Sequence, residues 1–176
     1  MTSVPQLETA RLILRGFALD DFEFYRSVWA DPDIVTFVGG RVRTEEDSWL
    51  KFHSNAGYWV MHGIGQWVIV DKLTGNLRGQ CGFMKNRRGL SPDISHTMEI
   101  GWVLSTAAQG QGIAGEAVDA ALRWSDRRFG DAVTCIIHPH NKPSIRLAER
   151  AGFSLLADAQ YHGEPTLIFR REPVRR

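Results

Sequence analysis

The stretch from residue 97 to residue 129, TMEIGWVLSTAAQGQGIAGEAVDAALRWSDRRF, constrains the fold more than any other part of the chain. Its first part, Met98–Leu104, is apolar and aromatic and is typical of a strand. Its last part, 112–129, is typical of a helix that Gly130 ends. The turn between them is dense in glycine, and unpaired N–H groups and the helix dipole attract anions at such a point. The stretch therefore predicts an anion-binding cradle.

Four interpretations of the glycine turn can be weighed against its sequence. Its segment GQGIAG at 110–115 matches the G-x-G-x-x-G pattern of dinucleotide-binding folds. Such folds also place an acidic residue at the end of the next strand, whereas the strand expected at 132–137 is followed by His138 and its nearby acid, Asp131, precedes it. A nucleotide P-loop needs a Lys-Ser/Thr pair after the glycines, and none is present. A coenzyme pyrophosphate site and a purely structural turn stay open on these residues alone.

Length and charge narrow the class of protein. A chain of 176 residues suits one domain, 1–176, with a full hydrophobic core. Its 21 basic and 20 acidic side chains give a net charge of +1, which argues against a nucleic-acid partner. With no apolar run near the ~18 residues that span a bilayer and no signal peptide, we expect no membrane partner and a cytoplasmic location.

The two cysteines are expected to be buried, unreactive thiols. Cys81 and Cys135 lie far apart in apolar, strand-like runs. Buried reduced thiols fit this placement better than a disulfide or a metal site. No cluster has zinc-ligand spacing, so we expect no metal.

The pattern of the whole chain predicts a single α/β domain. Seven strands are expected, at residues 12–14, 65–70, 77–85, 98–104, 132–137, 153–159 and 165–171. Four helices are expected, at residues 20–29, 44–58, 112–129 and 141–152.

Several boundary residues and loops follow from local chemistry. The Asp20-Asp21 pair is expected to cap the first helix and Asp31-Pro32 to stop it, with a connection at 35–40. Thr44 and Asn141 are expected to cap the second and fourth helices. Residues 86–96 are polar and should form a surface loop.

Four segments together resemble the GNAT N-acetyltransferase superfamily. QGQGIA at 109–114, followed by Glu116-Ala117, is similar to its Q/R-x-x-G-x-G/A signature. LETARLILR at 7–15, EIGWVL at 99–104 and NKPSIRLAERAGF at 141–153 resemble segments of its ribosomal-protein N-terminal (Rim-type) branch. The four segments occur in the order of that branch and cover nearly the whole chain.

The resemblance implies a fold and a co-substrate. It implies an α/β (α+β) GNAT fold, a mixed and mostly antiparallel sheet of about seven strands with a splay between strands 4 and 5 and about four flanking helices. It implies that acetyl-coenzyme A binds in the splay, with the pantetheine arm on the backbone of Trp102, Val103 and Leu104 and near the Asn141 side chain. The pyrophosphate would take amide N–H groups from Gln109, Gly110, Gln111, Gly112, Ile113, Ala114 and Gly115.

The reaction that the resemblance implies is direct attack of a neutral amine on the thioester, which calls for a base and an acid. Glu99, on the central strand near the splay, is the candidate base, although a salt-bridged carboxylate would explain it equally. Ser144 is the candidate acid by resemblance to N-x-x-S, although a first-turn hydroxyl would also explain it. Many GNAT enzymes carry a tyrosine where this chain has Ala148, so an acid tyrosine from this helix is excluded. His138 and His140 are alternative bases or loop residues.

The resemblance does not identify the acceptor. We expect acetyl transfer to a primary amine, either a protein N-terminus or a small molecule such as a polyamine, an amino acid or an antibiotic. The alternative is a non-catalytic coenzyme A-binding sensor or regulatory module, and the protein is expected to be a monomer or homodimer. Acceptor choice is expected to lie in the segments least like the family: 37–43, Tyr58-Trp59, 87–96 and Tyr161-His162.

Overall fold

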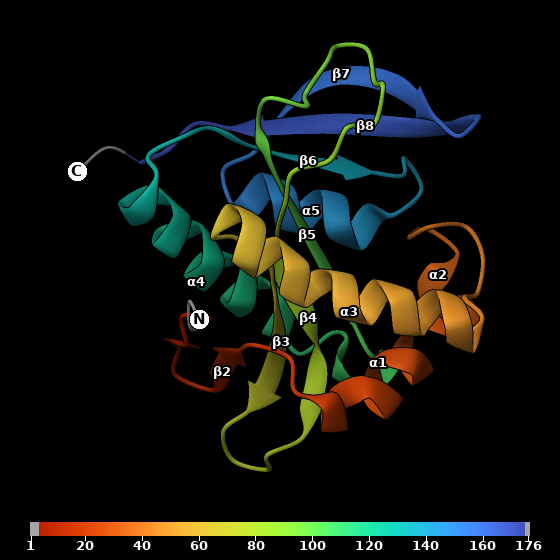
Figure 1. The fold of residues 1–176 in the computed structure, drawn as a ribbon. Coiled ribbons are helices and arrows are strands. Elements are labelled where there is room, and N and C mark those ends of the chain that lie inside the picture. The colour runs from red at the N-terminus through yellow and green to blue at the C-terminus, as the bar shows by residue number, and fades with distance from the viewer. Residues whose placement is uncertain (1–3, 175–176) are drawn as a thin grey trace.

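An eight-stranded open sheet forms the centre of the computed structural model, which describes residues 4–174 (Figure 1). The strand order is β1-β2-β3-β4-β5-β6-β8-β7, and all neighbours are antiparallel except β5 and β6. The strands are β1 Leu7–Glu8, β2 Leu12–Arg15, β3 Gln66–Asp71, β4 Leu77–Met84, β5 Met98–Leu104, β6 Val133–Ile137, β7 Ser154–Tyr161 and β8 Glu164–Arg171.

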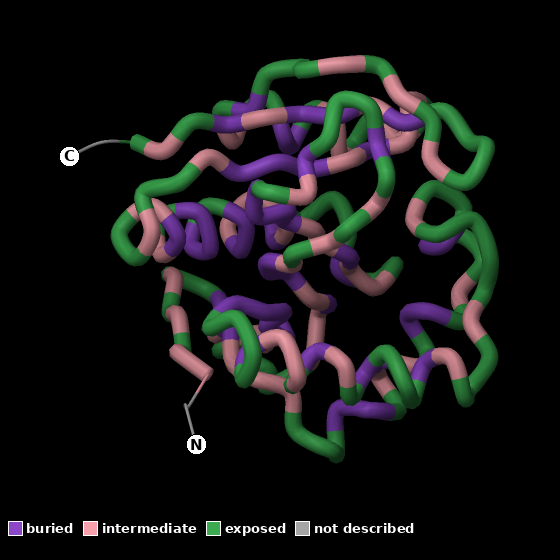
Figure 2. The backbone as a smooth tube through the Cα atoms, turned by 45° about the horizontal axis from the view of Figure 1, so that its top comes forward, coloured by how far each residue is buried: buried purple, intermediate pink, exposed green. Residues whose placement is uncertain are grey.

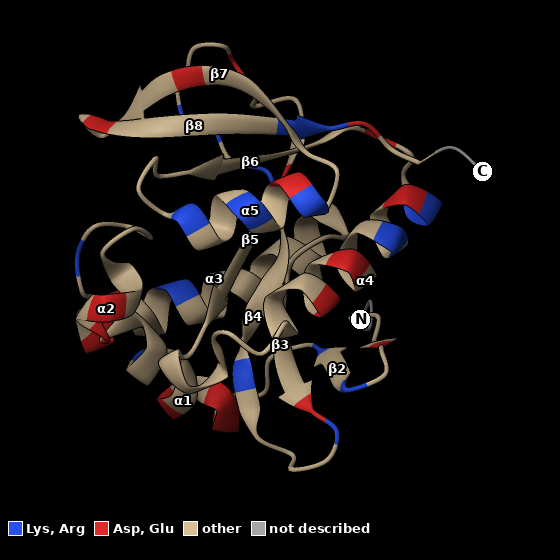
Figure 3. Ribbon diagram, turned by 180° about the vertical axis from the view of Figure 1, so that it is seen from behind, with Lys and Arg blue, Asp and Glu red and all other residues tan. Residues whose placement is uncertain are grey.

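Helices cover both faces of the sheet. The helices are α1 Phe22–Trp29, α2 Pro32–Val35, α3 Glu45–His62, α4 Ile113–Arg128 and α5 Lys142–Arg150, with 3-10 turns η1 Leu19–Asp21 and η2 Thr106–Ala108. From one side α3 and α1 lie over the sheet, and from the opposite side α4 and α5 lie in front of it (Figures 1 and 3). None of the helices within residues 4–174 is long and apolar enough to cross a membrane.

Two apolar clusters fill the space between these layers, and the buried segments in Figure 2 follow the strands and the inner sides of the helices. On the α4 side, the ring of Trp124 lies 5.1 Å from Trp67 and 6.0 Å from Phe83, centroid to centroid. On the α1 and α3 side, Phe52 of α3 lies 5.3 Å from Tyr25 of α1. Aromatic rings bury the most area per residue, so these clusters fix how the helices sit on the sheet.

The predicted fold class is confirmed, and the differences lie at the N-terminal end. The segment 7–15 makes two antiparallel strands rather than one, with Leu7 opposite Leu14. Residues 32–35 form α2, a helix that the sequence does not predict, between the expected stop at Asp31-Pro32 and the expected connection at 35–40. Helix α3 continues to His62, four residues beyond the expected end at 58, until Gly63 takes a left-handed φ of 64°. A two-residue strand and a one-turn helix are too short to give a periodic signal.

The predicted caps at Thr44 and Asn141 are confirmed, and the first helix begins and stops at the predicted residues. Thr44 Oγ1 accepts from the Asp47 amide at 3.0 Å, and Asn141 Oδ1 accepts from the Ser144 amide at 3.2 Å. Asp21 occupies the N-cap position of α1 as predicted, but its side chain makes no capping hydrogen bond there, because its carboxylate accepts from Arg15 and from the amide of Ala18. Helix α1 ends at Trp29, just before Asp31-Pro32 as predicted, and Asp31 also caps α2, where it accepts from the Asp33 amide at 2.9 Å. The side chain of an N-cap aspartate can thus be diverted from its helix by a nearby arginine.

Strands β5 and β6 separate soon after they meet. Only two positions pair, Met98 with Val133 and Glu99 with Thr134. Beyond them β5 continues beside β4 to Leu104, while β6 continues beside β8 (Figure 1). This is the splay that the sequence predicts between the fourth and fifth of seven strands, because β1 and β2 were expected as one strand.

A buried ion pair ties the far end of the sheet to the helices. The guanidinium of Arg171 on β8 donates to both carboxylate oxygens of Asp126 on α4, at 2.9 and 2.8 Å, and its Nε donates to Ala151 O after α5. The two side chains are 9% and 10% exposed. Hydrogen bonds from Arg171 are the main reason that the pKa of Asp126 lies below its ordinary value.

Replacement of this carboxylate should destabilise the fold. Asp126→Asn leaves Arg171 buried without a counter-charge, and we expect a loss of about 3 kcal/mol in the free energy of unfolding at pH 7. Because the folded-state pKa of Asp126 is lowered, its contribution is present above the unfolded pKa of about 3.9 and is lost as pH falls below it. Urea unfolding of both proteins from pH 7 to pH 3 measures the difference, which should shrink at the acid end.

The control is an exposed pair on the same strand. Arg170 and Glu172, 39% and 69% exposed, are 2.7 Å apart. Glu172→Gln should cost less than about 1 kcal/mol. An equal loss for the two variants would contradict a special role for the buried pair.

Candidate active site

The glycine turn forms a nest of free amide donors at the start of α4. Gly110 and Gly112 both have a φ of 73°, and no side chain caps the helix at Gly112. Within residues 4–174, no hydrogen-bond acceptor lies against the amide N–H groups of 110–115, whereas the Gln109 amide donates to Thr106 O. Consecutive N–H groups before a 16-residue helix suit a pyrophosphate, and glycine leaves the approach free of a Cβ.

Contacts between Glu116 and the segment that carries Thr9 and Arg11 hold this nest in place. Glu116, in the first turn of α4, accepts from Thr9 Oγ1 at 2.5 Å and from Arg11 Nε at 2.6 Å. Arg11 also donates through Nη1 to Gln111 O at 3.0 Å. Although burial raises the pKa of Glu116, the hydrogen bonds from Thr9 and Arg11 hold it below its ordinary value. The LETARLILR and QGQGIA segments are therefore in contact, and the role of Arg11 was not predicted from the sequence.

Strand β5 presents backbone groups toward the splay. Ser105 N donates to Arg78 O, and antiparallel pairs alternate between bonded and non-bonded positions. Val103 is therefore directed toward Gln80 on β4, while Trp102 and Leu104 are directed toward the side that β6 has left. A free strand edge can receive an extended ligand as an added strand.

Three predicted site residues meet across the splay. The indole Nε1 of Trp102 on β5 donates to Ser144 Oγ on α5 at 3.3 Å. Asn141 Oδ1 accepts from the Ser144 amide, which leaves the Asn141 Nδ2 group outside the cap. The serine hydroxyl therefore lies at the open side of β5 with its own proton still available for donation.

Glu99 lies at the vertex of the splay and is paired with an arginine. Its position on β5 is the last one that pairs with β6. Arg88, from the loop between β4 and β5, donates to both oxygens of Glu99 at 2.7 and 2.6 Å, and its guanidinium lies 4.9 Å from the Tyr161 ring. Burial acts to lower the pKa of Arg88, but hydrogen bonds and charge from Glu99 outweigh it and raise the pKa above its ordinary value.

The loop that carries Arg88 was predicted to lie on the surface and is partly buried. Residues 85–97 contain no helix or strand. Leu90 and Ile94 are nevertheless buried and pack against Ile168 of β8. The loop thus covers β6 and β8 and holds Arg88 over Glu99.

The two histidines after β6 lie at the edge of the same region. The His138 ring is 5.3 Å from Phe37, which precedes α3, and 5.2 Å from His140. The His140 amide donates to His138 Nδ1 at 3.1 Å, a loop-forming contact. Among residues 4–174 no group of three or more His, Cys, Asp or Glu side chains could hold a metal ion.

Cys81 and Cys135 are buried, and burial raises the pKa of both thiols.

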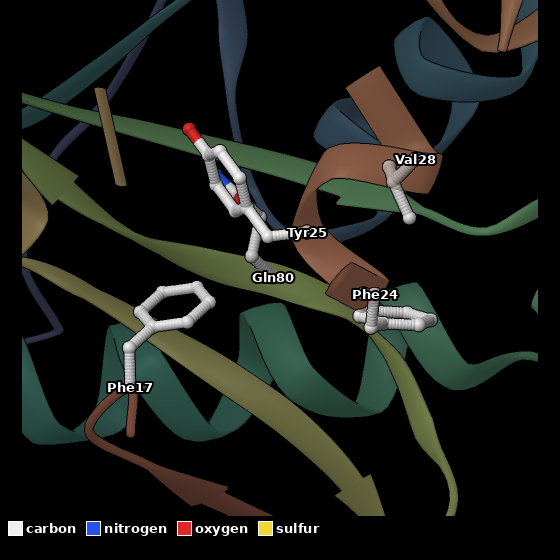
Figure 4. Close-up of a pocket in the computed structure, with 6 residues that line it drawn as sticks. Phe17, Phe24, Tyr25, Val28 and Gln80 are labelled. Carbon is white, nitrogen blue, oxygen red and sulfur yellow. The ribbon is translucent and has the colours of Figure 1, made fainter. Parts of the chain in front are cut away.

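A small cavity beside β4 is too small to be the site. It lies between α1 and β4 and is lined by Phe17, Phe24, Tyr25, Val28, Gly79 and Gln80 (Figure 4). It has room for about one water molecule. We interpret it as a packing gap under α1, since it cannot hold an acyl chain or an acceptor.

Comparison with known proteins identifies the class of enzyme. Residues 11–154 match the family model described as Acetyltransferase (GNAT) domain. A putative GNAT-family acetyltransferase from Bordetella pertussis shares 33% sequence identity and a TM-score of 0.85, over 95% of this chain and 99% of that one. YkkB, an uncharacterized protein of Bacillus subtilis strain 168, is 29% identical over 98% of both chains.

A Rim-type enzyme shares the fold at lower identity. The structure of RimL, a ribosomal L7/L12 α-N-protein acetyltransferase in complex with coenzyme A, has a TM-score of 0.78 at 16% identity, over 96% of this chain and 98% of that one. The chain belongs to the GNAT acetyltransferase family. It is therefore an acetyl-coenzyme A-dependent N-acetyltransferase.

The nest can be tested with a charged substitution. Gly112→Asp should weaken coenzyme A binding by tenfold or more, roughly, because a carboxylate then faces the pyrophosphate and the left-handed φ becomes strained. A Cβ at Gly112 would meet only Arg11 Nη2, at 3.5 Å, so the substitution does not overpack the protein. Isothermal titration calorimetry with coenzyme A measures the effect.

Gly75→Asp is the matched control. Gly75, in the turn between β3 and β4, has a φ of 72° and nothing within 4 Å of an added Cβ. It carries the same backbone strain without facing the nest. The two variants should lose similar stability, and a similar loss of coenzyme A affinity in both would refute the pyrophosphate assignment.

Proposed function

We propose that this enzyme transfers the acetyl group of acetyl-coenzyme A to a primary amine by direct attack of the neutral amine on the thioester. The observation that carries the proposal is the splay, which lies beside the nest of free amides and has Glu99 at its vertex. Acetyl-coenzyme A supplies the acetyl group as a thioester. A new C–N bond forms, the C–S bond breaks, and the thiol leaves with a proton.

The donor is held along β5 and at α4. The amides of 110–115 take the pyrophosphate, and the backbone of Trp102 and Leu104 pairs with the pantetheine arm. Val103 was a third candidate for that pairing, but the β4–β5 ladder directs its backbone away from the splay and its side chain packs with the α1 and α3 cluster. The Nδ2 group of Asn141, which is not needed for the helix cap, points to a contact with the same arm.

Glu99 is proposed as the base. An alkyl ammonium has a pKa of about 10.4 and an α-ammonium about 7.7–8.0, so the acceptor must lose a proton before it attacks. Both Glu99 oxygens accept from Arg88, yet each carboxylate oxygen has a further lone pair for a water or an amine. Arg88 also fixes the orientation of the carboxylate at the vertex.

Ser144 is proposed as the acid. Its hydroxyl accepts from Trp102 and lies at the N-terminal end of α5, whose dipole favours a negative charge nearby. It can therefore donate its proton to the departing thiolate. The absence of a tyrosine at Ala148 leaves this hydroxyl as the donor that α5 contributes.

The direct test is release of thiol from acetyl-coenzyme A with a panel of amines. The panel contains peptides with free α-amines, amino acids, a polyamine and an aminoglycoside. We expect turnover with at least one amine and an N-acetylated product by mass spectrometry. Coenzyme A binding without turnover on any amine would contradict the proposed reaction.

A second prediction concerns Glu99. Glu99→Gln should lower kcat at neutral pH by about 10²–10³, because general-base catalysis contributes that order of magnitude. The affinity for coenzyme A should change little. The pH profiles of kcat for the two proteins decide the role. If Glu99 is the base, the fall of kcat at acid pH that the unaltered enzyme shows should be absent from Glu99→Gln. If the two profiles have the same shape at every pH, Glu99 takes no part in proton transfer.

A control variant separates the loss of the proposed base from the loss of a buried ion pair. Glu99→Gln and Asp126→Asn each take one carboxylate away from a buried arginine pair, but Asp126 lies between α4 and β8. Below its unfolding temperature, Asp126→Asn should retain turnover. Comparable loss of kcat in both variants would show that disruption of a buried pair is enough to impair the enzyme.

A further inference from the structure

Three cationic side chains gather on the face of the sheet that carries Glu99. Arg43 precedes α3, Lys51 lies in its second turn, and Arg88 comes from the loop over β6. Within residues 4–174, Arg88 alone of the three has a carboxylate within 4 Å, and that carboxylate is Glu99. The charges on this face therefore sum to an excess of positive charge.

Arg43 is held in a fixed orientation by neutral groups. Its guanidinium lies 3.4 Å from the centroid of the Trp29 ring, and its Nη1 donates to the Tyr25 hydroxyl at 2.9 Å. Burial is the main cause that lowers the pKa of Arg43 below its ordinary value. A guanidinium that is stacked and oriented in this way keeps planar donors available for a carboxylate.

Lys51 lies within the electric field of both arginines. Desolvation by the surrounding protein lowers the pKa of Lys51, and the positive charges of Arg43 and Arg88 lower it further. Among the described residues, Lys51 forms no ion pair within 4 Å that would oppose these effects. Repulsion between like charges costs free energy that a bound anion would recover.

The same side of α3 carries polar atoms that lack partners. Ser48 and Asn55 lie three residues before and four residues after Lys51, which places them on one side of the helix. Ser48 Oγ and Asn55 Nδ2 are buried, and no hydrogen bond of good geometry joins them to residues 4–174, although the Asn55 side chain lies close enough to the Tyr25 hydroxyl to oppose the rise that burial causes in the pKa of Tyr25. Unpartnered buried groups are rare and indicate that a polar ligand or water completes this layer.

We infer that the acceptor amine carries a carboxylate, which Arg43 and Lys51 bind while its amino group lies at Glu99. The inference rests on the proposed function, since it places the acceptor at the same vertex. An amine with a second positive charge, such as a polyamine, meets repulsion at this face. An α-amino acid and a peptide with an acidic N-terminal residue share the required chemistry.

Matched amines test the inference and separate these two sources. Leucine is compared with leucinamide, a peptide that begins with Asp is compared with the same peptide that begins with Asn, and putrescine represents a dication. We expect kcat/KM to be roughly tenfold or more higher for the carboxylate-bearing member of one pair, the effect of one charged hydrogen bond. The pair that shows this difference tells whether the recognised carboxylate belongs to an α-amino acid or to an acidic N-terminal residue of a peptide. Equal kcat/KM within both pairs, or a preference for putrescine, would overturn the inference and leave acetyl transfer intact.

Two variants connect the preference to the cations. Lys51→Gln and Arg43→Gln should each reduce the carboxylate preference, roughly tenfold, through a higher KM for the charged acceptor, with the neutral acceptor unaffected. Lys51 is exposed and its only side-chain-mediated hydrogen bond is the one that its carbonyl accepts from Ser54 Oγ, which Lys51→Gln retains, so this variant decides the outcome if Arg43→Gln fails to fold. Arg127→Gln, an exposed arginine on α4, is the control and should keep the preference.

Binding measurements keep the inference testable without turnover. If no amine releases thiol, the proposed reaction fails, and calorimetry on the coenzyme A-loaded protein then compares leucine with leucinamide and the Asp with the Asn peptide. Tighter binding of a carboxylate-bearing member that Lys51→Gln abolishes supports the inference. No such difference overturns it. A Lys51→Gln protein with weakened coenzyme A affinity also overturns it, because the cations would then serve the coenzyme phosphates.

Discussion

The early separation of β5 from β6 is the constraint on which the rest of the structure depends. Two paired positions, ending at Glu99 and Thr134, hold the strands together, and beyond them each strand keeps its other neighbour. The backbone N–H and C=O groups on this edge of β5 have no partner strand, so they require a ligand or solvent as hydrogen-bond partner. The proposed base, the nest and the acceptor face are all positioned by where this pairing stops.

Much of the fold was predictable because its signals are local. The apolar run at Met98–Leu104 gave the limits of β5, and glycine before an amphipathic segment placed the start of α4 within one residue. The caps Thr44 and Asn141 satisfy amides three residues away and are encoded in the same few positions. The two-residue strand β1 and the four-residue helix α2 escaped prediction because each spans only about one period of its pattern, which gives no repeat to detect.

The sequence motifs predict the positions of the candidate site residues but not the contacts among them. Glycine and strand motifs indicated where the coenzyme would lie. The bond from Arg88 to Glu99 and the bond from Trp102 to Ser144 depend on a loop and a helix whose places are set by packing across the sheet. The unpaired cations of α3 and its neighbouring loop likewise appear only when three segments are folded onto one face, since the net charge of the whole chain is +1.

The link between Arg11 and Glu116 has a consequence for the order in which the protein is completed. The two residues are 105 positions apart, so closing this contact costs chain entropy that local helix formation does not. During synthesis the first strands leave the ribosome well before α4 exists and wait without their partner. The proposed phosphate-binding end of the enzyme is therefore a late product of folding, formed only when the amino-terminal hairpin and the middle of the chain meet.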